Sequence, residues 1–231
     1  MKRQRLRPQS SVVVITCICL AAAVLCAGCG LIANAANAMP LVIKAAYPGL
    51  KGKTTAVMVW PEPAVKIDYP RIQADIIASL QQKLMDAQKT EKPDDLKDTT
   101  FPVSWQSMMR YQQDNPDADS LPIEDNAKVV GVQRLIYIEI AEFQTRSDMS
   151  PDLYRGQIVA NLKVIEYENG KAKTGYEENN ITVKFPEKGP DEGVLNLGDE
   201  KTYAGTIGTF TGKVAWKFYK HEEERQLGEG R

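Results

Sequence analysis

The first 30 residues combine a basic start, an apolar stretch and a cysteine that follows small residues. Residues 1–7, MKRQRLR, carry four cations and no acid, and an apolar run of 14 residues follows from Val12 to Leu25. This order is typical of a secretory signal. As a helix the run would be about 21 Å long, which is shorter than the roughly 30 Å hydrocarbon core of a membrane. We therefore expect residues 1–28 to be removed and the rest of the chain to fold.

The end of this segment reads LCAGC at residues 25–29 and resembles the lipobox of bacterial lipoproteins. The resemblance implies cleavage between Gly28 and Cys29 and a diacylglycerol on the Cys29 thiol. It also implies that a further chain such as palmitate is often attached to the new amino group. Ala27 and Gly28 fit the pattern, whereas Cys26 stands where the family usually has leucine.

All four cysteines of the chain, at positions 17, 19, 26 and 29, lie within this segment. Cleavage before Cys29 leaves one cysteine, at the new N-terminus, so an exported chain has no disulfide framework and no stray thiol to mispair. Two or three acyl chains would anchor it durably, since each buried methylene contributes about 0.8 kcal/mol. The alternative is an uncleaved membrane helix, because apolar residues continue from Leu31 to Ala46. Both interpretations place residues 48–231 outside the cytoplasm, on a membrane surface.

Charge and composition narrow the possible partners. Residues 1–28 hold four cations and no acid, so the net charge of −1 for the whole chain becomes −5 for residues 29–231. We expect no nucleic-acid partner, because no basic stretch follows Arg7. A hydrophobic content of 43% is sufficient for a core. The expected organisation is a signal at 1–28, a lipidated N-terminus and spacer at 29–50, an α+β periplasmic domain at 51–220 and a charged flexible tail at 221–231.

Hydrophobic periodicity predicts the elements of that domain. Residues 54–60 and 134–143 read as buried strands, and the second is apolar on both faces. Apolar and polar residues alternate over residues 155–167. Asn169-Gly170 is a strong hairpin signal, so a return strand is expected at 173–178. Residues 180–185 either continue this strand or form another. Helices are predicted from Asp68, as N-cap, to about Gln88, from Ser104 to Asp114, from Glu124 to Val132 and from Asp199 to Glu224.

The order of strand, helices, strand, hairpin and helix indicates an α+β domain. We expect a single, mainly antiparallel sheet with helices covering one face. Pairing of the first strand with a later one across the intervening helices would make the sheet mixed.

This layout resembles the periplasmic domain of small envelope lipoproteins such as the curli-secretion protein CsgG and the penicillin-binding-protein activator LpoB. The resemblance is carried by a strand like AVMVW (56–60), a helix like IQADIIASLQQKL (72–84), a strand like RLIYIEIAEF (134–143) and a hairpin like QIVANLKVIEYENGK (157–171). It implies non-enzymatic work as an adaptor, activator or assembly component of an envelope complex. The alternative function is an oligomeric pore-forming or ring-forming secretion component, for which one hairpin per subunit is thin support.

The chain offers few groups for chemistry. His221 is the only histidine and is expected at an exposed helix end, so we predict no metal site and no cofactor. Glu139 and Glu142 are three residues apart on one strand, which predicts opposite faces and no acid/base pair. A hydrolase that uses these carboxylates is the least favoured hypothesis, and no catalytic residue is assigned.

Two further groups suit packing or an interface. Gly205, Gly208 and Gly212 make a small-residue stripe on the last helix, which predicts close helix–sheet packing. Trp105, Met108, Met109 and Tyr111 cluster on the short middle helix, where core packing is the default; Trp105, Met109 and Tyr111 are the candidate interface residues. Gly30 stands where some bacteria read aspartate as an inner-membrane signal, so the outer membrane is favoured over the cell membrane. The envelope partner and the oligomeric state are not predicted.

Overall fold

The computed structural model describes residues 40–119 and 122–223. They fall into two units, of which the larger is Lys44–Lys220. The smaller unit contains an antiparallel pair of short strands, β1 (Leu41–Ile43) and β6 (His221–Glu223). The predictions for the signal, for Cys29 and for residues 224–231 concern parts of the chain outside the described residues.

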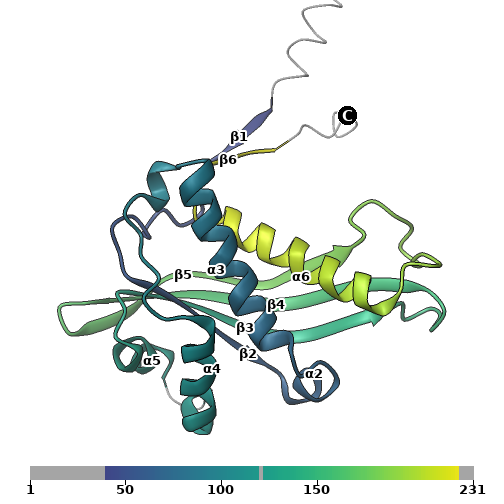
Figure 1. Cartoon of the computed structure of the whole chain (residues 1–231), viewed down its shortest axis with the longest axis horizontal. Helices are drawn as coiled ribbons and strands as arrows, with labels where there is room; N and C mark the ends of the chain where they lie inside the picture. The colour runs from purple at the N-terminus through teal and green to yellow at the C-terminus, as the bar shows by residue number, and fades with distance from the viewer. Residues whose placement is uncertain (1–39, 120–121, 224–231) are drawn as a thin grey trace, which may run out of the picture. The chain divides into compact units, whose positions relative to one another are not determined.

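The larger unit alternates helices with one sheet (Figure 1). Its strands are β2 (Thr55–Pro61), β3 (Arg134–Arg146), β4 (Tyr154–Glu168) and β5 (Lys171–Phe185). Its α-helices are α2 (Pro63–Asp68), α3 (Ile72–Thr90), α4 (Trp105–Asp114), α5 (Ile123–Val130) and α6 (Asp199–Trp216). Two 3₁₀ turns, η1 (Asp94–Leu96) and η2 (Pro116–Asp119), complete it. No helix in the described ranges has the length and apolarity needed to cross a membrane.

The four-stranded sheet has the order β2-β3-β4-β5. β2 pairs with β3 in parallel, with Thr55 beside Arg134, and the other two pairings are antiparallel. The sheet is therefore mixed, and the predicted α+β class is confirmed. β5 is one continuous strand with register shifts, which resolves the alternative left open for residues 180–185.

Helices α3 and α6 pack on each other and on the sheet, because each presents an apolar stripe. Ile72, Ile76, Leu80 and Leu84 of α3 are completely buried, as their i, i+4 spacing predicts. β3 is buried on both faces over Leu135–Ile138. Figure 1 shows α5 on the side of the sheet away from α6, so helices lie on both sides rather than on one.

The outer edge of β2 is covered by glutamine side chains. Gln73 of α3 and Gln112 of α4 both donate from Nε2 to the Val59 carbonyl, at 2.8 and 2.9 Å. These bonds satisfy a backbone group that an edge strand otherwise leaves open to pairing with another chain. They also fasten both helices to the strand.

Three predicted boundaries were wrong in detail. Asp68 is the last residue of α2 and does not cap α3, which begins at Ile72. The last helix ends at Trp216, and residues 221–223 form β6. The core also begins before residue 51, since Tyr47 and Leu50 are buried. By contrast, the Ser104 cap is confirmed, with its hydroxyl accepting from the Ser107 amide at 3.2 Å.

The glycine stripe of α6 packs closely at one position. A Cβ on Gly205 would lie 2.3 Å from the Phe185 ring, whereas nothing lies within 4 Å of one on Gly208. Gly212 meets only the tip of Lys83, at 3.9 Å. Close packing is therefore confirmed for Gly205 and wrong for the other two.

Gly205→Ala and Gly208→Ala should change stability in opposite directions. The first forces the Phe185 ring to move, and overpacking of this kind costs about 1–3 kcal/mol. The second removes a helix-interior glycine in open space and should add up to about 1 kcal/mol. Urea unfolding followed by circular dichroism measures both. Equal destabilisation by the two substitutions would contradict this account of the packing.

Candidate functional site

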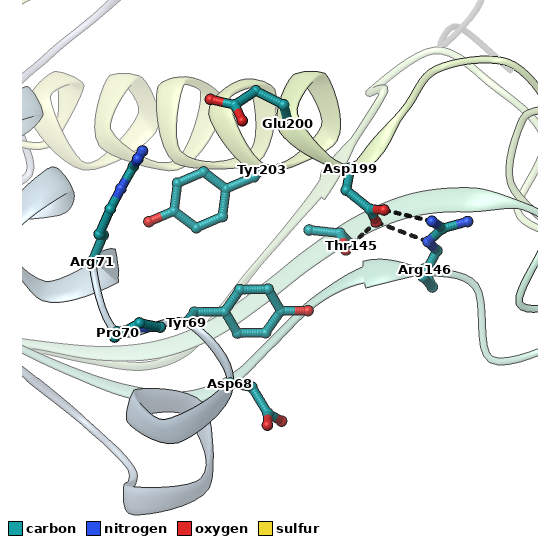
Figure 2. Close-up of a pocket in the computed structure, with 9 residues that line it drawn as sticks. All are labelled: Asp68, Tyr69, Pro70, Arg71, Thr145, Arg146, Asp199, Glu200 and Tyr203. Carbon is teal, nitrogen blue, oxygen red and sulfur yellow. Dashed lines mark hydrogen bonds and ion pairs between the residues drawn. The ribbon is translucent and has the colours of Figure 1, made fainter.

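A pocket of about 560 Å³ lies where three segments of the larger unit meet (Figure 2). The turn between α2 and α3 supplies Asp68–Arg71, the end of β3 supplies Thr145 and Arg146, and the first turns of α6 supply Asp199, Glu200 and Tyr203. Because β2 and β3 are parallel, the chain leaves β2 opposite Ile140, and α2 then packs against the part of β3 that ends at Arg146. Pockets at the carboxyl ends of parallel strands are a common place for ligands.

The turn between α2 and α3 results from Pro70. A proline disfavours helical geometry in the residue before it, so Tyr69 leaves the helical path with φ −130° and ψ 70°. The Tyr69 amide donates to the Val65 carbonyl at 2.9 Å and closes α2. Its own carbonyl accepts from the Ile72 amide at 3.0 Å, where α3 begins. The bend places the Tyr69 ring over the sheet.

Two aromatic rings, those of Tyr69 and Tyr203, form the floor of the pocket, and both contact the buried ring of Phe143. Tyr69 meets Phe143 edge-on with ring centres 4.6 Å apart, and Phe143 meets Tyr203 in the same way at 5.5 Å. The rings of Tyr69 and Tyr203 are nearly parallel, 6.1 Å apart. Phe143 is buried, whereas both tyrosines are half-buried and offer ring surface to a ligand.

An ion pair closes one side of the pocket. Arg146 donates from Nε and Nη2 to the two carboxylate oxygens of Asp199, at 2.8 and 2.5 Å, and the Thr145 hydroxyl donates to the same carboxylate at 3.1 Å. The hydrogen bond from Arg146 lowers the pKa of Asp199. The guanidinium also lies 4.0 Å from the centre of the Tyr154 ring. This arrangement joins the end of β3 to the start of α6 and neutralises both charges.

The opposite side is formed by Tyr203 and Arg71, which both interact with Asp75. The Tyr203 hydroxyl donates to Asp75 Oδ2 at 2.8 Å, and Arg71 Nε lies 3.5 Å from the same oxygen. The Arg71 guanidinium lies 6.0 Å from the centre of the Tyr203 ring. Burial, and then the bond to Asp75, raise the pKa of Tyr203. The phenol is therefore neutral at physiological pH.

Two carboxylates remain at the rim. Asp68 and Glu200 lie on opposite sides of the pocket in Figure 2 and point away from each other. Neither forms an ion pair with another residue of the described ranges. The pocket therefore combines an aromatic floor, an internally neutralised side and two carboxylates without a counter-ion. This set of groups suits the binding of a ligand.

A second pocket, of about 450 Å³, lies at the other end of β3 beside Lys53, Gln133 and Glu168. Glu168 there accepts from Lys53 and from the buried Arg134, each at 2.7 Å. The hydrogen bonds from Lys53 and Arg134 lower the pKa of Glu168 to about 2. Since its charges already have partners, this pocket is a weaker candidate.

The predicted interface residues are not part of the first pocket. Trp105, Met109 and Tyr111 lie on α4, where Trp105 is 38% exposed. Met109 and Tyr111 are half-buried against the core, and the Tyr111 hydroxyl donates to Asn126 Oδ1 at 3.0 Å. Met108, which belongs to the same sequence cluster, is buried. An interface at Trp105 stays a prediction.

The prediction that Glu139 and Glu142 face opposite sides of the sheet was wrong. Glu139 pairs with Asn161 and Glu142 with Val159, and those two β4 residues share a face. The cause is a register shift after Ile140, which inserts one residue and reverses the alternation. The Glu139 carboxylate accepts from the Asn161 amide at 3.2 Å.

The prediction for His221 was also wrong. His221 lies in β6, is 8% exposed and has Nε2 at 3.3 Å from Glu223 Oε1. Across residues 40–119 and 122–223, no cluster of three or more histidine, cysteine, aspartate or glutamate side chains is arranged to hold a metal ion.

The residues that line the pocket were not selected from the sequence. Asp68 was assigned only to a helix cap. Arg146 and Asp199 are 53 residues apart, so their pairing has no local signal. The Tyr69-Pro70 step was the one available clue, since a tyrosine placed before a proline leaves the helical face.

Comparisons with known proteins give a likeness only among solved structures. No protein-family model matches the chain, and no curated protein matches it significantly. Lipoprotein GNA1162 from Neisseria meningitidis is 13% identical with a TM-score of 0.42, covering 70% of this chain and 94% of that one. The hypothetical protein CT253 from Chlamydia trachomatis is 14% identical with a TM-score of 0.42, covering 72% and 92%. A PelC dodecamer from Paraburkholderia phytofirmans is 11% identical with a TM-score of 0.39, covering 79% and 100%. Values this low say nothing about the function of this chain.

The ionisation of Tyr203 tests the geometry of the pocket. An unperturbed phenol has a pKa of about 10. Because the folded protein holds this proton more tightly, the contribution of Tyr203 to stability is complete below about pH 10 and is lost as the pH rises through the folded pKa. Asp75→Asn should lower the pKa of Tyr203, since it removes the carboxylate beside the phenol.

The measurement is alkaline titration of phenolate absorbance, with the Tyr203 component obtained by subtracting a Tyr203→Phe variant. Asp86→Asn is the control, because it removes an exposed carboxylate on the same helix. A Tyr203 component that titrates at the ordinary value, or that Asp75→Asn leaves in place, would show that the site is wrongly described.

Proposed function

We propose that this protein is an exported lipoprotein, anchored to a membrane through Cys29, whose larger folded unit acts non-enzymatically as an adaptor, activator or assembly component of an envelope complex. The observation that carries the proposal is the segment LCAGC at residues 25–29, which follows a basic start and an apolar run and ends with the last cysteine of the chain. A lipid on Cys29 supplies the membrane attachment.

The position of the pocket supports the adaptor part of this proposal. The chain enters the larger unit near the C-terminal end of α6, where the Tyr47 amide donates to the Lys217 carbonyl at 2.8 Å. The pocket lies at the N-terminal end of the same helix. The 18 residues of α6 span about 27 Å. The point where the chain enters the larger unit and the pocket are thus at opposite ends of one helix.

The chemistry of the pocket supports a binding role. Arg146 and Asp199 neutralise each other, and the phenol of Tyr203 is held in its protonated form. These groups can orient a ligand through ring faces and fixed charges. We accordingly propose a partner protein of the envelope as the ligand.

Lipid labelling tests the anchor. Cys29→Ala should abolish incorporation of an alkynyl fatty acid and leave the signal uncleaved, because the thiol that accepts the lipid is gone. Cys26→Leu is the matched control: it removes the neighbouring cysteine and introduces the residue usual at that position of the lipobox. It should retain the label. The readouts are in-gel fluorescence and the length of the chain in cells.

The proposal fails if the label persists in Cys29→Ala. It also fails if both variants lose the label to the same extent, since the acylated residue is then not specified by position 29.

A further inference from the structure

Three large apolar side chains project into solvent from the segments that surround the pocket. Ile67 of α2 is 78% exposed, Met149 of the β3–β4 loop is 73% exposed and Leu195 of the β5–α6 loop is 64% exposed. Figure 1 shows the β3–β4 and β5–α6 loops together at the end of the sheet where α6 begins. Apolar side chains that are exposed near a pocket are available to a molecule that binds there.

These loops are fixed to the elements that form the pocket. Arg146 donates from Nη1 to the Pro151 carbonyl at 2.8 Å, which holds the loop that carries Met149. Val194, next to Leu195, exchanges backbone hydrogen bonds with Tyr154, at 2.9 and 3.0 Å. Ile67 directly precedes Asp68 of the pocket. The segments that carry these three apolar residues are therefore joined to the elements that form the pocket.

The charges of this surface favour a cation. The lining includes the carboxylates of Asp68, Asp199 and Glu200 and the guanidiniums of Arg71 and Arg146. Arg146 is bound to Asp199. Arg71 lies beside Asp75, a carboxylate that does not line the pocket. The carboxylates of Asp68 and Glu200 are thus left to a ligand. An anion would be repelled by both of these carboxylates.

The aromatic floor favours the same ligand. A cation within about 6 Å of the centre of an aromatic ring is attracted to the ring face. The structure contains an internal example, since the Arg71 guanidinium lies 6.0 Å from the centre of the Tyr203 ring. Tyr69 offers a second, nearly parallel ring. A volume of about 560 Å³ lies within the range of small-molecule sites and accommodates a long side chain.

We propose that this pocket binds a lysine or arginine side chain of a partner polypeptide. The cation lies against the rings of Tyr69 and Tyr203 and is attracted by the carboxylates of Asp68 and Glu200, which lie on opposite sides of the pocket. Apolar residues on either side of the cation contact Ile67, Met149 and Leu195. This assignment rests on the proposed adaptor function and names the chemistry that the adaptor recognises.

The test uses the full-length protein in detergent micelles with its tyrosines replaced by 3-fluorotyrosine. The ¹⁹F signals of Tyr69 and Tyr203 are assigned with Tyr69→Phe and Tyr203→Phe. The probes are three blocked tripeptides, Leu-Lys-Leu, Leu-Glu-Leu and Leu-norleucine-Leu. The lysine peptide should shift both assigned signals saturably, whereas the other two should leave them in place.

Charge variants decide whether the rim carboxylates take part. Asp68→Asn combined with Glu200→Gln should lower the affinity for the lysine peptide about threefold to tenfold. Asp98→Asn combined with Asp114→Asn removes the same amount of charge elsewhere on the surface. This control should leave the affinity for the lysine peptide unchanged. Unchanged signals from the other tyrosines show that each variant is folded.

Three results would overturn the assignment: no shift with the lysine peptide, an equal shift with the glutamate or norleucine peptide, or unchanged affinity in the rim variant. The outcome is separate from that of lipid labelling. If the lysine peptide does not bind, the labelling result for Cys29 still stands. If Cys29 is not labelled, the titration result for the pocket still stands.

Discussion

The parallel pairing of β2 with β3 determines where every other part of the larger unit lies. Two parallel strands cannot be joined by a tight turn, so the chain between them must cross over. The crossover carries α2 to α5, and its α3 stripe is buried against β2 and α6. Since β2 ends opposite Ile140 and α2 then packs against β3, the turn at Tyr69 lies beside Thr145 and Arg146. The pocket is a consequence of this pairing.

The sequence predicts the regular elements because their signals are local. The stripe of Ile72, Ile76, Leu80 and Leu84 repeats at helical spacing, and all four side chains are buried. Asn169 and Gly170 both have positive φ, which is the backbone conformation that their hairpin turn requires. β3 was expected to be central because both of its faces are apolar, and it lies between β2 and β4.

Features that depend on a distant partner were missed. The bulge after Ile140 exists only in the register of β3 against β4, so the shared face of Glu139 and Glu142 could not be read from their spacing. Residues 221–223 continue the helical pattern of α6 in sequence, yet they pair with β1, which lies at the start of the described chain. The pocket is of the same kind, because the contact between Arg146 and Asp199 joins elements that no periodicity relates.

Sequence and structure bear on different halves of the proposed function. The cysteine at position 29 provides the argument for a membrane attachment, and the pocket provides the argument for a partner. The helix α6 connects them, with the entry of the chain near one end and the carboxylates of Asp199 and Glu200 at the other.

The most direct test places a photo-crosslinking amino acid on the full-length protein in cells, at Leu195 or at Val129. These side chains are matched in exposure, at 64% and 63%, but Leu195 lies in the loop before α6, whose first turns line the pocket, and Val129 lies on α5, before the start of β3. Our account predicts a discrete heavier adduct with another envelope protein from position 195, none from position 129, and loss of the adduct when Asp68→Asn and Glu200→Gln are introduced. An adduct from position 129 alone, or adducts only between copies of this chain, would contradict it.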